Sequence, residues 1–143
     1  MTFQKRQSAG YLANHMARLF AKGLHRRIRS LGLAPAQFMT LLALWEEDGL
    51  TQHELTRRLD VEQATMANTL SRMERDGLIE RRSHPGDGRS QSIHLTAKSA
   101  ALRGPATEAA RAQNETALAG FNAEERQTFL ELMRRAIASM QEG

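Results

Sequence analysis

The sequence predicts a mainly α-helical fold that carries one small β-hairpin. Apolar residues recur at intervals of three and four over most of the 143 residues, which is the spacing of amphipathic helices. Only two short stretches beyond the middle of the chain, separated by turn-forming residues, are typical of paired strands. Hydrophobic residues make up 41% of the chain and charged residues 25%, which indicates a compact globular protein rather than a disordered one.

Two helices are predicted in the first third of the chain. Residues 8–30 form a long helix that ends near Gly32, and Pro35 opens the next helix because its fixed φ and missing N–H suit a first helical turn. The apolar side chains of this second helix are Phe38, Leu41, Leu42 and Trp45. Their helical spacing predicts that they form one buried face.

Two shorter helices follow in close succession. Thr51 and Glu54 have the spacing of a capping box, so we expect a helix of about nine residues to begin there. Residues 60–61 then turn directly into a further helix at roughly 62–76, which Gly77 ends by supplying a left-handed residue.

A hairpin follows these helices. Residues 78–82 and 91–95 are predicted as strands, and residues 84–89 between them are rich in Pro, Gly and Asp, which favour turns. Two short helices joined by a tight turn and followed by a basic-tipped hairpin describe a winged helix-turn-helix. Such a module places a helix in the major groove of DNA and a hairpin tip in the adjacent minor groove.

The helix at 62–76 has the composition of a recognition helix. Met66, Leu70 and Met73 share one face, which predicts that this face is buried. The opposite face carries Ala64, Thr65, Asn68, Ser71, Arg72 and Arg75. Small polar residues let a helix lie deep in a groove, and the amide of Asn68 matches the paired contact to adenine. The alternative is a solvated face on an ordinary amphipathic helix.

The C-terminal third is predicted to be helical and to mediate dimerisation. Thr96 caps an Ala-rich helix that residues 104–105 (Gly-Pro) interrupt, and Asn122 with Glu125 begins the last helix. The residues expected in a dimer interface are Phe129, Met133, Ile137 and Met140 of the last helix, with Leu12 and Met16 of the first. Alanines between residues 97 and 112 allow close helix approach. A membrane-surface helix is the alternative, but the polar side of the last helix mixes both charge signs.

The stretch from Gly49 to Thr96 resembles the MarR family of transcriptional regulators. The resemblance is carried by residues 73–81 (Met-Glu-Arg-Asp-Gly-Leu-Ile-Glu-Arg) and residues 87–89 (Asp-Gly-Arg), and residues 62–66 resemble the SlyA-like branch. It implies an obligate homodimer with intertwined terminal helices, whose winged modules bind a pseudo-palindromic operator in double-stranded DNA. It also implies that a small aromatic, phenolic or carboxylate ligand releases the DNA, so the chain would be a ligand-responsive repressor.

The same resemblance implies a division of the chain and a set of DNA contacts. Residues 1–34 and 96–143 would form the dimerisation region, and residues 35–95 would form the DNA-binding domain. The expected DNA-binding residues are Gln52, Gln63, Ala64, Thr65, Asn68, Arg72, Arg81, Arg82, His84, Asp87 and Arg89. The family often has Arg in place of Asn68 and a further Arg in place of Gly88. We therefore expect a different base preference and one fewer minor-groove contact.

The positive charge of the chain lies outside this predicted DNA-binding module. The formal net charge is +4, yet residues 1–45 contain seven basic and no acidic residues, while residues 51–95 contain seven of each. The pattern of helices and hairpin, rather than the net charge, therefore predicts DNA binding.

Part of the basic surplus forms a stripe along the first helix. Its members, which recur at intervals of three and four, are His15, Arg18, Lys22, His25 and Arg29, and Tyr11 begins the line. Three interpretations remain open: a solvated face, a phosphate contact by residues 26–29, or a ligand pocket. In the pocket, Arg18 or Lys22 would anchor an anionic aromatic ligand beside Tyr11 and His15, and Met39 and Trp45 would form its wall unless they belong to the core.

The sequence contains no sign of catalysis. The five His residues lack metal-ligand spacing, and no Gly-rich phosphate loop, Ser elbow or paired-carboxylate motif is present. We therefore expect no enzymatic activity, no cofactor and no metal site. Without Cys there is no thiol redox switch, and without a signal-peptide core or a long apolar run we expect a cytoplasmic protein that does not span a membrane. The alternative function is a ligand-independent winged helix for architectural DNA binding or protein contact.

Overall fold

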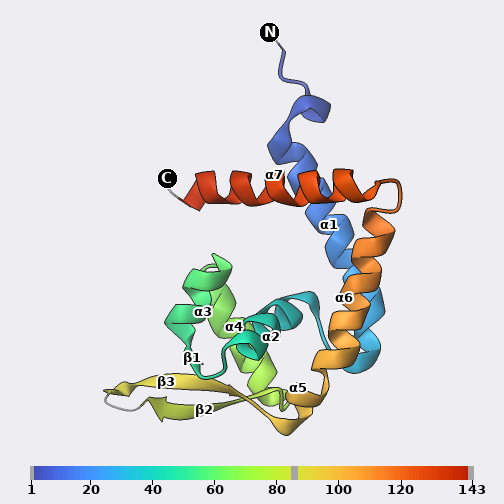
Figure 1. Ribbon diagram of the computed structural model, residues 1–143. Coiled ribbons are helices and arrows are strands. Elements are labelled where there is room, and N and C mark those ends of the chain that lie inside the picture. The colour runs from blue at the N-terminus through green and yellow to red at the C-terminus, as the bar shows by residue number, and fades with distance from the viewer. Residues whose placement is uncertain (1, 85–86, 142–143) are drawn as a thin grey trace.

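The chain folds into a lobe that contains a small sheet, formed by residues 35–101, and a helical arm formed by the helices before and after it (Figure 1). The computed structural model describes residues 2–84 and 87–141, although not the side chains of His84 and residues 87–89. The helices are α1 (Ala9–Ile28), α2 (Pro35–Glu46), α3 (Gln52–Leu59), α4 (Gln63–Arg75), α5 (Ala97–Ala101), α6 (Arg103–Ala117) and α7 (Ala123–Gln141). The strands are β1 (Leu50–Thr51), β2 (Ile79–His84) and β3 (Asp87–Leu95). Single turns of 3-10 helix lie at Lys5–Gln7 and Arg29–Leu31.

The predicted hairpin is confirmed and is part of a three-stranded antiparallel sheet in the order β1-β3-β2. Arg81 pairs with Ile93 within the hairpin, and Leu50 of β1 pairs with Ile93 from the other side. The strands are longer than expected because backbone pairing continues into the polar residues toward the tip. The two-residue strand β1 was not predicted, since so short a segment has no periodicity of its own.

Local capping signals determine where the helices of the lobe begin and end. Thr51 Oγ1 accepts a hydrogen bond from Glu54 N (3.1 Å), and Glu54 Oε1 accepts one from Thr51 N (3.0 Å), which confirms the capping box. Gly77 has the left-handed backbone (φ +74°) that ends α4. Asp60 also adopts a positive φ of 51° and forms the tight turn between α3 and α4, although it is not glycine.

The Ala-rich helix breaks earlier than expected. The interruption was predicted at residues 104–105, but α5 ends at Ala101 and α6 begins at Arg103. Pro105 is therefore the third residue of α6, where a backbone N–H would have no partner within the helix. Asn122 and Glu125 exchange reciprocal hydrogen bonds of 2.9 and 2.8 Å and begin α7 as predicted.

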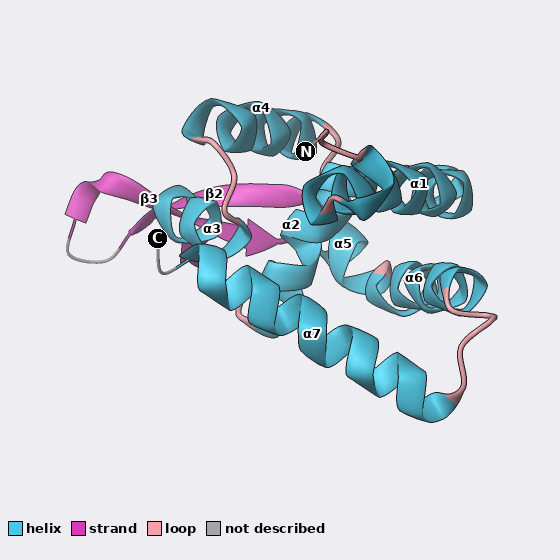
Figure 2. Ribbon diagram, turned by 90° about the horizontal axis from the view of Figure 1, so that it is seen from above, coloured by secondary structure: helices cyan, strands magenta, loops and turns pink. Residues whose placement is uncertain are grey.

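The hydrophobic core lies mainly within the lobe and extends to Ile28 at the end of α1. Its fully buried large apolar side chains are Ile28, Leu41, Leu44, Leu50, Leu55, Met66, Leu70, Met73, Leu78 and Ile93. In contrast, no described residue of α7 is buried. Figures 1 and 2 together show that α7 leads away from the end of α6 toward α3, and Figure 2 shows it apart from α1. Gln141 Nε2 there donates a hydrogen bond of 2.8 Å to Asp60 Oδ2.

Among the described residues, no helix has both the length and the apolar character that crossing a bilayer requires.

Candidate nucleic-acid interface

One face of α4 is buried and the opposite face is free for contact. Met66, Leu70 and Met73 pack into the core, as their spacing predicts. The residues proposed to contact bases or to allow close approach are all exposed: Gln63, Ala64, Thr65, Asn68 and Arg72. None of these five side chains forms a hydrogen bond or ion pair with another described residue, and none is acidic. Within the part of the chain that the structure describes, this face of α4 is therefore polar and has no side-chain partners.

A hollow of about 240 Å³ lies where the start of α3 meets the sheet. It is lined by Thr51, Gln52, His53, Arg81, Ser90 and Gln91. Gln52 and Arg81, which lie 29 positions apart in the sequence, are thus brought together as donors beside the first turn of α3. His53, Ser90 and Gln91 were not predicted here. Only the sheet register places β3 next to the start of α3, and no local pattern encodes that register.

The two arginines of β2 differ in their surroundings. Arg81 Nε lies 3.4 Å from Glu74 Oε1, so this side chain bridges the hairpin and α4. Arg82 Nη2 instead lies 2.6 Å from Glu80 Oε1 on the same strand and does not line the hollow. The predicted contacts of His84, Asp87 and Arg89 fall on side chains outside those that the structure describes.

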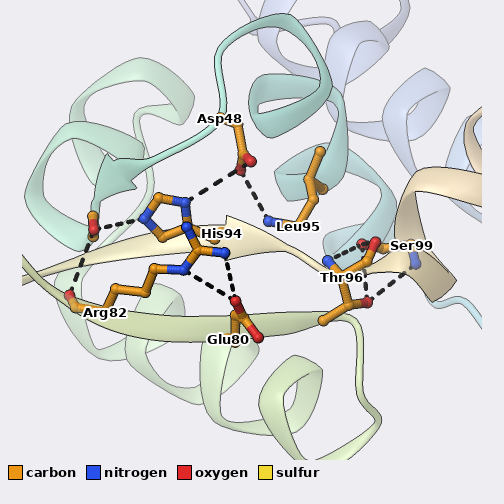
Figure 3. A network of polar contacts seen from close by, with 8 residues as sticks. Asp48, Glu80, Arg82, His94, Leu95, Thr96 and Ser99 are labelled. Atoms are coloured by element: carbon orange, nitrogen blue, oxygen red, sulfur yellow. Dashed lines mark hydrogen bonds and ion pairs between the residues drawn. The ribbon is translucent and has the colours of Figure 1, made fainter.

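A polar network holds the base of the hairpin (Figure 3). Asp48 Oδ1 accepts a hydrogen bond from Leu95 N (2.9 Å), and Asp48 Oδ2 lies 3.9 Å from His94 Nδ1. His94 Nε2 lies 2.7 Å from Ser92 Oγ, which in turn contacts the carbonyl oxygen of Arg82. The segment after α2 is thereby tied to both strands, which limits how far the hairpin can move relative to α2.

Several carboxylates of the module are held in local ion pairs and hydrogen bonds. Arg75 Nε donates a hydrogen bond of 2.9 Å to Asp76 Oδ1, and buried Gln37 donates one of 3.2 Å to Asp76 Oδ2. The Arg75 guanidinium, followed by Gln37, lowers the pKa of the Asp76 carboxyl. Similarly, the hydrogen bond to Glu47 raises the pKa of Arg58. These carboxylates lie just beyond the C-terminal ends of α4 and α2 and are held within ion pairs.

The residues predicted to surround a ligand do not form one site. An open pocket of about 420 Å³ lies between α1, α2 and α6, and of the six predicted residues only Met39 lines it. Trp45 is instead a core residue: it is 8% exposed, and its Nε1 donates a hydrogen bond of 3.1 Å to the carbonyl oxygen of Ser99. The reason is that Trp45 points toward α5 rather than toward the surface of α2.

The stripe on α1 is likewise outside this pocket. The helix lines the pocket with Ala17, Phe20, Ala21 and Leu24. Tyr11, His15, Arg18 and Lys22 are exposed and lie roughly a third of a turn away around the helix. Within this group the rings of Tyr11 and His15 are 6.3 Å apart, and Lys5 Nζ lies 5.5 Å from the centre of the Tyr11 ring.

The residues predicted for a dimer interface are left uncovered or half-covered by the chain itself. Leu12, Ile137 and Met140 are exposed, and Met140 reaches 74%. Met16, Phe129 and Met133 are half-buried.

Comparison with known proteins agrees with a DNA-binding module built around α4 and the hairpin. A family model described as MarR family matches residues 31–90. The HTH-type transcriptional repressor NicR of Pseudomonas putida is 35% identical over 107 residues, which cover 75% of this chain and 68% of NicR.

Solved structures extend the similarity over nearly the whole chain. The crystal structure of MarR superposes on this chain with a TM-score of 0.81 at 26% sequence identity. The matched region covers 92% of this chain and 96% of the MarR chain. A MarR-family transcriptional regulator from Silicibacter pomeroyi gives a TM-score of 0.77 at 29% identity, with coverages of 95% and 92%.

Proposed function

The chain belongs to the MarR family of DNA-binding transcriptional regulators, and on that premise we propose that it is a repressor that binds a pseudo-palindromic operator as a homodimer and is released by a small ligand. The observation that carries this proposal is the exposed face of α4. It presents amide, hydroxyl and guanidinium groups from Gln63, Thr65, Asn68 and Arg72, and the carboxylate of Glu74 on the same helix is paired with Arg81.

We assign base readout to this face of α4. Ala64 and Thr65 are small enough to let the helix approach the floor of the major groove, and the amide of Asn68 offers the paired donor and acceptor that match adenine. Arg72 lies two turns along from Thr65 on the same exposed side and is suited to guanine or to a flanking phosphate.

We assign the backbone contacts to the start of α3 and to the hairpin. Gln52 and Arg81 line one hollow beside the N–H groups of the first turn of α3, and a phosphate there would meet several donors at once. Arg82 and His84 would add phosphate contacts. By resemblance to the family, Arg89 would enter the minor groove and Asp87 would hold the tip in shape.

The proposed homodimer rests on uncovered apolar surface. Leu12 and Leu19 on α1 and Leu132, Ile137 and Met140 on α7 are exposed in the single chain. Large exposed apolar areas on soluble proteins mark interaction surfaces. A second copy would bury it and would place two copies of α4 against two half-sites of the operator.

Salt-dependent binding of the purified full-length chain to its own promoter region tests the proposal. We expect a discrete protected site with two half-sites, and an affinity that falls steeply with salt because phosphate contacts release counterions. Binding without a protected site would contradict the operator proposal and favour architectural DNA binding. An absence of binding at low salt would favour a protein-contact module.

A substitution at the hairpin tip separates DNA contact from assembly. Arg89→Ala should weaken operator binding by about tenfold or more, since it removes a minor-groove contact worth about 1–3 kcal/mol. The mass measured by light scattering should not change. Operator affinity equal to that of the wild type would contradict the role assigned to Arg89.

A further inference from the structure

The histidine at the base of the hairpin lies between two polar partners. The side chain of His94 on β3 is 18% exposed, and its ring lies beside Asp48 of the segment after α2 (Figure 3). Its Nδ1 is 3.9 Å from Asp48 Oδ2, and its Nε2 is 2.7 Å from Ser92 Oγ. Ser92 is buried, and its Oγ also lies 3.5 Å from the carbonyl oxygen of Arg82 on β2. One imidazole ring therefore connects the segment after α2 with β3 and, through Ser92, with β2.

A neutral ring cannot make all of these contacts at once. A neutral imidazole carries a single N–H, and the carboxylate of Asp48 favours that hydrogen on Nδ1. Nε2 is then an acceptor and takes the one hydroxyl hydrogen of Ser92, so Ser92 has none to donate to the carbonyl oxygen of Arg82. The other neutral form would point the lone pair of Nδ1 at the carboxylate of Asp48, which is unfavourable.

A second proton on the ring removes this conflict. The Nδ1–H group then faces Asp48, and the Nε2–H group donates to Ser92 Oγ, which frees the hydroxyl hydrogen for the carbonyl oxygen of Arg82. The two long separations, 3.9 Å and 3.5 Å, are the ones that this proton would shorten. Hydrogen bonds to a charged group are also stronger than neutral ones. The protonated ring therefore holds the segment after α2 to both strands more firmly than the neutral ring does.

The charges around the ring are compatible with a cation at this position. Glu80 of β2 is the cross-strand neighbour of His94, and its carboxylate lies 2.6 Å from Arg82 Nη2, so this neighbouring pair has no net charge. The helices that contact β3 contribute charged groups that are bound elsewhere: Glu47 to Arg58, Glu54 to the backbone N–H of Thr51, and Lys98 to the carbonyl oxygen of Asp76. Among the described residues, Asp48 is thus the charged group that pairs with the ring.

We propose that His94 is a positioning residue for the hairpin and that a proton on its ring raises the affinity of the chain for its operator. The hairpin carries Arg81 and Arg82, and fixing it before DNA arrives reduces the ordering cost of binding. Since a histidine gains its second proton between about pH 5 and 8, affinity is greatest at the acidic end of this range and falls as the pH rises through it. The inference rests on the proposed function, because it describes the regulation of operator binding.

Operator titrations of the full-length chain at constant ionic strength test this inference. The wild type should bind about tenfold more tightly at about pH 5.5 than at about pH 8. His94→Gln keeps a neutral donor for Ser92 but cannot take up a proton, so its affinity should change by less than about twofold over the same range. His15→Gln, at an exposed position of α1, is the matched control and should retain the full rise. A rise that persists in His94→Gln would overturn the proposal.

A second variant applies if His94→Gln fails to fold. Asp48→Asn keeps an acceptor for the backbone N–H of Leu95 but removes the charge that faces Nδ1, so the rise on acidification should shrink to about threefold or less. An undiminished rise in this variant would count against the proposal. So would a rise that disappears in His53→Gln, because that ring lies in the hollow at the start of α3 and would then bind phosphate directly.

Amide hydrogen exchange of the hairpin without DNA separates this inference from the proposed function. After correction for the intrinsic effect of pH on exchange, the protection of β2 and β3 should rise several-fold on acidification in the wild type but not in His94→Gln. Unchanged protection in the wild type would overturn the inference. If protection rises but no operator is bound at any pH, the coupling of His94 to the hairpin stands and the proposed function fails. If an operator is bound with the same affinity at every pH, only this inference fails.

Discussion

The lobe around α4 and the terminal helix α7 both have amphipathic sequences, but in the single chain the apolar residues of the lobe are buried and those of α7 are not. Leu55, Leu70 and Ile93 of the lobe are fully buried. On α7 no described residue is buried, and Ile137 is 51% exposed (Figure 2). An apolar stripe therefore indicates that a helix face becomes covered, but not whether the same chain covers it.

The two regions should respond differently to substitution, and the largest effect is expected in the lobe. Leu70→Ala removes a fully buried side chain that the chain itself has packed, so the free energy of unfolding should fall by about 2–5 kcal/mol. Chemical denaturation followed by circular dichroism measures the change. A loss below 1 kcal/mol would show that the lobe is not the self-sufficient core that the burial indicates.

A charge placed on α7 should instead break assembly. Ile137→Asp puts a carboxylate in the proposed interface, so the chain should become monomeric and lose about 100-fold in operator affinity, because two linked half-sites no longer bind together. Sedimentation and a binding titration measure the two effects. Gln127→Asp, on an exposed polar position of the same helix, is the control and should leave both unchanged. A dimeric Ile137→Asp protein would contradict the proposed interface.

A smaller effect, confined to sequence preference, is expected on the exposed face of α4. Asn68→Ala should cost about 1–3 kcal/mol at one base position of each half-site and leave other positions unaffected. Selection of binding sites from a randomised operator measures this. Unaltered preference at every position would remove Asn68 from base readout, while stability should stay near that of the wild type because the side chain is exposed.

The smallest effect concerns the link between α4 and α2. Since Arg75 and Gln37 lower the pKa of Asp76 in the folded chain, the ionised carboxylate stabilises the fold above the ordinary aspartate value of about 3.9. This contribution disappears as the pH falls through the lowered pKa. The difference in unfolding free energy between wild type and Asp76→Asn should therefore shrink on going from about pH 6 to about pH 3. A difference that grows on acidification would contradict the assigned direction.

Most of the candidate DNA surface could be predicted because its pattern is local. The spacing of Met66, Leu70 and Met73 predicts which side of α4 is buried, and hence which side is exposed. The pocket could not be predicted in this way. Met39 was expected beside Tyr11 and Lys22, but the relative rotation of α1 and α2 places it beside Phe20 and Leu24 instead.

The sequence by itself determined most of the helices, their caps and the hairpin, because these depend on residues close together in the chain, but it did not predict β1 or the break between α5 and α6. Thr51 with Glu54 and Asn122 with Glu125 form the predicted reciprocal hydrogen bonds. Only the tertiary structure decided which distant faces meet. It seats Gln113 against Gly23 and Arg27, and it leaves the basic stripe of α1 outside the pocket. Such contacts depend on the packing angles of whole helices, which no short sequence pattern encodes.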